Sequence, residues 1–157
     1  MKIKDIIDIL PHSGEYTQRK TNEITTIVIH HSASPAGKFS PKDFANWHIT
    51  GKYRMPRIAY HFCIEPDGTV YQTNKITSIS WHASNANYYS VGILLNGDFR
   101  VEKPTVAQMQ TLRELIPEIE KMVNKKLELK GHREVDATSC PGDNMMILKN
   151  EWRSLNK

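Results

Sequence analysis

Residues 25–31 read TTIVIHH, a run of apolar and β-branched side chains that ends in two histidines. Because apolar groups occupy successive positions, the run predicts a strand that is buried on both faces. Alternate side chains of a strand point to opposite faces, so His30 and His31 cannot both line one site. The sequence therefore predicts a buried strand whose end carries one functional histidine, either His30 or His31.

The residues that follow this strand predict a helix and then a hairpin. A capping box with proline at the first helical position, at residues 40–43, begins a helix that Gly51 ends. Residues 66–69 contain an Asp-Gly pair, which supplies the positive φ of a tight turn. The flanking residues 58–65 and 70–73 are therefore predicted to be two antiparallel strands.

The second half of the chain predicts a long helix between two short strands, residues 91–96 and 127–130. The helix begins at Thr105, and Pro117 within it predicts a kink or an early break, because proline lacks the N–H that bonds to the preceding turn. Its apolar positions at helical spacing are Met109, Leu112, Ile116, Ile119 and Val123. A final helix is predicted to hold Ile147, Leu148, Trp152 and Leu155.

These elements predict an α/β fold, a single domain with a central mixed β-sheet flanked by helices. A chain of 157 residues has the size of one globular domain. Its formal net charge is +4. We expect residues 1–24 to be an N-terminal extension packed on a domain of residues 25–157. The apolar start is interrupted by Asp5 and Asp8 and closed by Pro11, so no signal peptide is evident and membrane insertion is not expected.

The cysteine count and the isoelectric point indicate the redox compartment and the charge of the binding partners. Two cysteines, Cys63 and Cys140, suit a reducing compartment better than a disulfide framework. The isoelectric point near 9.0 favours anionic partners. No basic stripe with interleaved aromatic residues supports nucleic-acid binding.

A polar loop downstream could complete a metal site. Residues 131–143 read GHREVDATSCPGD, with His132 eight residues before Cys140. Two imidazoles and one thiolate are a natural ligand set for zinc and leave a fourth position open to water. The spacing alone is a weak signal. A nucleobase deaminase site is excluded, because the second cysteine that such a site needs is missing after Pro141.

Five motifs in order make the chain resemble the type 2 N-acetylmuramoyl-L-alanine amidases, a family related to the peptidoglycan recognition proteins and to single-domain phage endolysins. The resemblance runs from about residue 25 to the final helix, and it implies the fold of that family. The motifs are Ile27-Val28-Ile29-His30-His31-Ser32-Ala33-Ser34, Ala59-Tyr60-His61-Phe62, Asp67-Gly68-Thr69-Val70, Trp81-His82-Ala83, and Gly131-His132-Arg133 through Cys140-Pro141-Gly142.

The resemblance implies a zinc site and catalytic residues at named positions. The three zinc ligands fall on His30, His132 and Cys140, which leaves His31 as a packing residue. Tyr60 takes the place of a catalytic tyrosine. Thr138 stands where some members carry a catalytic lysine, and we interpret it as a hydroxyl donor to the developing oxyanion. The resemblance assigns no general base, because neither Glu134 nor Asp136 matches a catalytic position of the family.

A polar loop is the expected substrate contact. Trp81, His82 and Asn85 lie in an asparagine-rich segment suited to hydrogen bonds with a muramyl peptide. By contrast, His61 and Cys63 are interpreted as structural residues of their strand.

The implied function is zinc-dependent hydrolysis of the amide between the lactyl group of N-acetylmuramic acid and L-alanine in peptidoglycan. The resemblance and the lack of a signal peptide favour a phage or prophage endolysin, a bacteriolytic enzyme of cell wall degradation. Such an enzyme stays in the host cytoplasm until a holin releases it to the wall. We expect a monomer whose partner is peptidoglycan. The alternative is a non-catalytic peptidoglycan-binding module.

Overall fold

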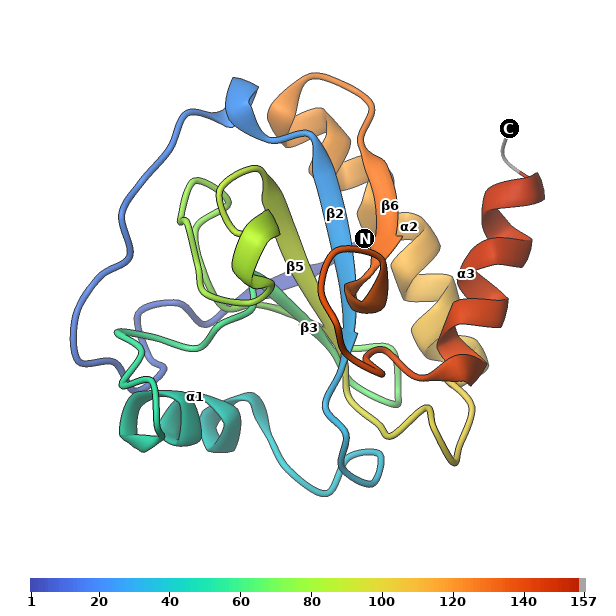
Figure 1. Cartoon of the computed structure of the whole chain (residues 1–157), viewed down its shortest axis with the longest axis horizontal. Coiled ribbons are helices and arrows are strands. Elements are labelled where there is room, and N and C mark those ends of the chain that lie inside the picture. The colour runs from blue at the N-terminus through green and yellow to red at the C-terminus, as the bar shows by residue number, and fades with distance from the viewer. Residues whose placement is uncertain (156–157) are drawn as a thin grey trace.

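The computed structural model describes residues 1–155, which form a mixed six-stranded sheet with helices packed around it (Figure 1). The strand order is β1-β4-β3-β5-β2-β6. Strands β3 and β4 are antiparallel, and the other neighbours are parallel. The predicted fold class is therefore confirmed. The strands are β1 Ile3–Asp5, β2 Thr26–His31, β3 Phe62–Ile64, β4 Val70–Gln72, β5 Ser90–Leu95 and β6 Glu128–Gly131.

The hairpin between β3 and β4 forms where the Asp-Gly pair predicts it. Gly68 has φ +87°, a conformation that side chains rarely adopt. The first strand of the hairpin is shorter than predicted, because residues 58–61 do not continue the ladder of β3. The Asn74 side-chain amide donates to the carbonyls of Ile58 and Tyr60 at 2.7 Å each, so a side chain takes the place of a neighbouring strand there.

Three α-helices lie within the described residues: α1 Pro41–Thr50, α2 Val106–Val123 and α3 Asp143–Leu155. The predicted caps of α1 and α2 are present, with Ser40 accepting from the Asp43 N–H and Thr105 from the Gln108 N–H. Helix α2 continues past Pro117 to Val123, so the expected early break is wrong. Burial on both sides of the proline explains this continuity, because all five predicted apolar positions of α2 lie in the core.

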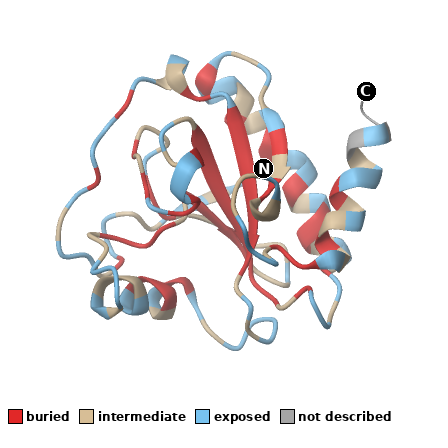
Figure 2. Ribbon diagram, viewed as in Figure 1, coloured by how far each residue is buried: buried red, intermediate tan, exposed pale blue. Residues whose placement is uncertain are grey.

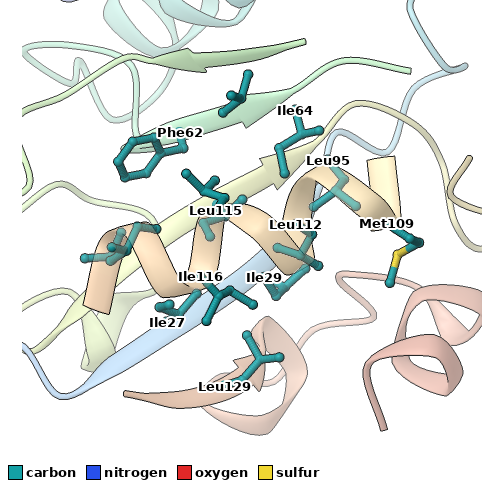
Figure 3. Packing of buried hydrophobic residues seen from close by; sticks show 14 of the residues in the cluster. Ile27, Ile29, Phe62, Ile64, Leu95, Met109, Leu112, Leu115, Ile116 and Leu129 are labelled. Atoms are coloured by element: carbon teal, nitrogen blue, oxygen red, sulfur yellow. The ribbon is translucent and has the colours of Figure 1, made fainter. Parts of the chain in front are cut away.

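The main core lies between α2 and one face of the sheet. Figure 3 shows Leu112, Leu115 and Ile116 of α2 packed over strand residues such as Ile27 and Ile29. The central strands β2 and β5 are buried along their whole length, as Figure 2 shows in red. This core fixes the positions of the strand ends, from which the functional loops leave.

Residues 1–24 join the same sheet and its surrounding loops. Strand β1 pairs in parallel with β4 at the sheet edge. The Arg19 guanidinium is buried and donates to the carbonyls of Ile76, Asn87 and Tyr88. This segment therefore fastens the polar loop that precedes β5.

The two faces of β2 are covered differently. Ile27 and Ile29 pack in the main core, whereas Val28 packs on Ala83 and Ala86 in a separate small cluster. His30 shares the face of Val28, because side chains alternate along a strand. The end of β2 therefore carries His30 away from α2 and toward the loops.

No helix within residues 1–155 is both long and apolar enough to cross a membrane.

Candidate functional site

Parallel pairing brings the two predicted ligand histidines together. Strands β2 and β6 are parallel neighbours, and their register places Ile29 opposite Gly131. His30 follows Ile29 within β2, and His132 directly follows Gly131, the last residue of β6, so the two histidines lie side by side at the same edge of the sheet. Their ring centroids are 4.5 Å apart.

Cys140 reaches these histidines because the loop after β6 folds back on itself. The Arg133 N–H donates to the Cys140 carbonyl at 2.8 Å, which closes the loop. The Cys140 Sγ lies 3.8 Å from the His30 Nδ1 and accepts weakly from the His31 N–H at 3.5 Å. Burial raises the pKa of the Cys140 thiol to about 11, and the His31 N–H partly offsets that rise.

The three side chains fit a zinc ion by donor type and by spacing. The ligand atoms of His30, His132 and Cys140 all lie within 4.8 Å of one another. Bond lengths of a tetrahedral zinc site imply about 3.6 Å between a nitrogen and a sulfur ligand. The 3.8 Å between His30 Nδ1 and Cys140 Sγ is close to that separation. These residues could therefore hold zinc with little rearrangement.

Both candidate ligand histidines have a polar partner on the second ring nitrogen. The His132 Nε2 lies 2.8 Å from the Asp136 Oδ2, and the His30 Nε2 lies 2.9 Å from the His82 Nδ1. Such partners orient an imidazole and leave its other nitrogen for a metal. The role of Asp136 was missed from sequence, although its spacing of four residues from His132 was a visible signal.

His31 is anchored outside the group of three. Its Nδ1 accepts from the Phe99 N–H at 3.2 Å and lies 3.8 Å from the Asp98 carboxylate. Burial lowers the pKa of His31 to about 4, against an opposing effect of Asp98. The ring is therefore neutral at pH 7 and holds the turn at residues 98–99. Of the two adjacent histidines, the structure brings His30 to the other two ligands.

Tyr60 and Thr138 line the same cleft, which has a volume of about 310 Å³. The Tyr60 ring lies 5.1 Å from the His30 ring, and burial raises the pKa of the Tyr60 hydroxyl above its usual value. That hydroxyl therefore keeps its proton and remains a donor. The Thr138 Oγ1 accepts from the Cys140 N–H at 3.2 Å, which leaves the Thr138 hydroxyl proton free to donate.

The three residues expected to contact substrate lie in different surroundings. His82 is buried and lines the cleft through its contact with His30. Trp81 is half exposed and packs edge-on against Tyr16 at 5.8 Å, and Asn85 is exposed on the short helix Ser84–Ala86. Arg100 also lines the cleft, and sequence reasoning did not single it out.

The residues that line this cleft, rather than its volume, identify it as the candidate active site. A larger cavity of about 580 Å³ lies between α2 and β6 and is lined by residues such as Ile116, Leu129 and Trp152. Its lining contains no histidine or cysteine. The smaller cleft gathers the three ligands and two hydroxyl donors, so it is the candidate active site.

The loop that carries His132 and Cys140 is clamped by helix α3. The Lys149 side chain is fully buried, and its Nζ lies 2.5 Å from the Glu134 Oε2. The same carboxylate oxygen accepts from the Gly131 N–H at 2.7 Å. A buried ammonium ion thus fixes the acidic residue that holds the start of the loop.

Replacing Glu134 is expected to destabilise the protein strongly. The Lys149 side chain is fully buried, whereas the Glu134 side chain is 31% exposed. Glu134→Ala leaves the buried Lys149 ammonium without its carboxylate, and an uncompensated buried charge costs on the order of 3 kcal/mol. Urea unfolding followed by circular dichroism measures the loss. The control is Glu128→Ala, which removes a partner 3.5 Å from Lys130 in a largely exposed pair and should cost less than about 1 kcal/mol. Equal losses in the two variants would show that the pairing of Lys149 with Glu134 does not hold the loop.

The chain matches a known protein family over a range that covers the whole site. A family model described as N-acetylmuramoyl-L-alanine amidase matches residues 20–143. Among curated proteins, peptidoglycan-recognition protein LB of Drosophila melanogaster is 31% identical over 152 residues. That alignment covers 91% of this chain and 64% of the relative, so the chain spans less than two thirds of that protein's length.

Solved structures show the same architecture. N-acetylmuramoyl-L-alanine amidase LysC from Clostridium intestinale URNW superposes with a TM-score of 0.81 at 26% identity and 98% coverage of both chains. The Ph2119 endolysin from Thermus scotoductus MAT2119 bacteriophage Ph2119 superposes with a TM-score of 0.79 at 29% identity. That match covers 90% of this chain and 92% of the endolysin. The similarity therefore extends over nearly the whole chain.

Proposed function

Because the chain belongs to the N-acetylmuramoyl-L-alanine amidase family, we propose that it hydrolyses the amide bond between N-acetylmuramic acid and L-alanine in peptidoglycan, with zinc as cofactor. The observation that carries this proposal is the convergence of His30, His132 and Cys140 at one edge of the sheet. Three protein ligands with an open fourth position are typical of hydrolytic zinc sites.

The residues of the cleft have two proposed roles: some bind the metal, and others stabilise the charge that develops on the substrate. When bound, zinc would supply a nucleophile at neutral pH by acidifying a water, and it would polarise the scissile carbonyl. His30, His132 and Cys140 would hold the metal in the cleft. Tyr60 and Thr138 present hydroxyl protons where the carbonyl oxygen gains negative charge, which is the role of oxyanion donors.

The biological setting that we propose is lysis of a bacterial wall by a phage or prophage endolysin. The structural similarity to a bacteriophage endolysin and to a clostridial amidase supports this setting. The enzyme would act as a monomer, reaching the wall from the host cytoplasm. The formal net charge of +4 would add an attraction to anionic wall polymers that weakens as salt is raised.

End-group analysis of purified peptidoglycan tests the proposed reaction. We expect new L-alanine amino termini without new reducing sugars, because the enzyme cleaves an amide and no glycosidic bond. A strong zinc chelator should suppress these termini, and added zinc should restore them. If no new ends of either kind appear while the protein still sediments with the wall, the chain is a peptidoglycan-binding module and not an amidase.

A further inference from the structure

A chain of buried hydrogen bonds runs from the backbone to the candidate ligand His30. The Ser90 hydroxyl lies 2.5 Å from the Ala86 carbonyl and 3.2 Å from the His82 Nε2. The opposite nitrogen of that ring, His82 Nδ1, lies 2.9 Å from the His30 Nε2. Ser90, His82 and His30 are all buried, so water does not compete for these contacts.

The direction of each hydrogen bond in this series follows from the Ala86 carbonyl, with which the series ends. A carbonyl oxygen only accepts, so the Ser90 hydroxyl proton points to Ala86. Ser90 must then accept from His82, which places the His82 proton on Nε2. Burial favours the neutral form of an imidazole, so the His82 Nδ1 carries a lone pair. That lone pair accepts the proton on the His30 Nε2.

The consequence for His30 is a fixed tautomer. With its proton on Nε2, the neutral ring has its lone pair on Nδ1. This is the nitrogen that lies 3.8 Å from the Cys140 Sγ. The series of hydrogen bonds therefore turns a lone pair of His30 toward the Cys140 thiol before any metal arrives.

The backbone holds the His82 ring in the place that this chain requires. A Cβ at Gly92 would lie 2.7 Å from the Cγ and Nδ1 of His82, so the ring rests directly on strand β5 where a side chain is absent. His61 fixes the same stretch of β5, because its Nδ1 accepts from the Gly92 N–H at 3.0 Å. Its Nε2 bonds the Ser78 carbonyl at 2.7 Å.

We propose that His82 and Ser90 are positioning residues that set the tautomer of His30 and thereby preorganise the zinc site. The proposal rests on the proposed function, since it assumes that His30 is a zinc ligand. In this proposal His82 orients the ligand His30, in place of the substrate contact that the sequence predicts. Loss of an outer partner of this kind lowers metal affinity by roughly 10- to 100-fold.

Two substitutions of His82 separate hydrogen bonding from packing. His82→Asn places an amide oxygen near the position of Nδ1, so it can still accept the His30 proton. His82→Phe keeps a ring of similar size but offers no acceptor. We expect the zinc dissociation constant, measured by competition with a chromophoric chelator, to rise by roughly 10- to 100-fold in His82→Phe and to stay within about threefold in His82→Asn. Ser90→Ala should raise it about tenfold, because the His82 tautomer is no longer fixed.

A matched control and a metal-free readout complete the test. His48→Asn makes the same substitution at an imidazole that accepts from the Ala59 N–H and bonds none of the candidate ligands, so zinc affinity should not change. Long-range ¹H–¹⁵N correlation spectra of the metal-free wild type should show His30 and His82 both protonated on Nε2. A proton on the His30 Nδ1, or equal zinc affinities in His82→Phe and His82→Asn, would overturn the proposal. If the wild type instead binds no zinc while the predicted tautomers are observed, the zinc dependence in the proposed function fails and the hydrogen-bond chain remains.

Discussion

Cys140→Ser should abolish zinc retention and lower amidase activity by more than about 10³-fold, because metal activation of the water and the carbonyl lowers the barrier by several kcal/mol. The hydroxyl of serine is a poor replacement for a thiolate, since it stays protonated near neutral pH and does not neutralise the metal charge. Zinc content after dialysis and release of L-alanine termini from peptidoglycan measure the two losses.

The second cysteine provides the matched control for this experiment. Cys63 is fully buried in β3, and burial raises the pKa of its thiol above the usual range, so it acts as a small apolar side chain. Cys63→Ala should therefore keep its zinc and its activity, apart from some loss of stability to the cavity. Retention of full activity in Cys140→Ser would remove Cys140 from the zinc site and leave His30 and His132 without their third ligand.

Sequence patterns predicted the elements whose signals are local. The capping boxes at Ser40 and Thr105 place the starts of α1 and α2 correctly, because a cap is completed within three residues. The β-branched run before His30 gives β2 to within one residue. The resemblance to the amidase family, which rests on short motifs in order, is confirmed by the match over residues 20–143.

The features that sequence did not predict depend on contacts between distant residues. The hydrogen bond between His30 and His82 joins residues 52 positions apart and needs the parallel register of β2 and β5. A lysine is almost never fully buried unless its charge is paired, and the Lys149 ammonium is fully buried against the Glu134 carboxylate. Pro117 does not end α2, because the apolar residues that follow it pack in the core. In each case a tertiary contact outweighs the local preference of the residue.

The proposed role of the Tyr60 hydroxyl, donation to the oxyanion, can be tested separately from metal binding. Its ring lies beside His30, but no hydrogen bond to a candidate ligand is found among the described residues for its hydroxyl. Removing that hydroxyl should leave metal binding intact. The ring itself should keep its packing, because phenylalanine retains the whole aromatic surface.

Tyr60→Phe should therefore lower kcat by about 10²–10³-fold while the zinc dissociation constant stays unchanged, since one oxyanion donor in a water-poor site contributes about that factor. The substrate concentration at half-maximal rate should change little, because a donor that acts on developing charge stabilises the transition state more than the bound substrate. Kinetics on a soluble muramyl-peptide substrate, paired with chelator competition on the same preparation, measure both quantities. Thr138→Val removes the other donor from an exposed position, where water can replace it, and should cost less. If Tyr60→Phe kept the wild-type kcat, stabilisation of the oxyanion in this cleft would have to come from the metal and Thr138 alone.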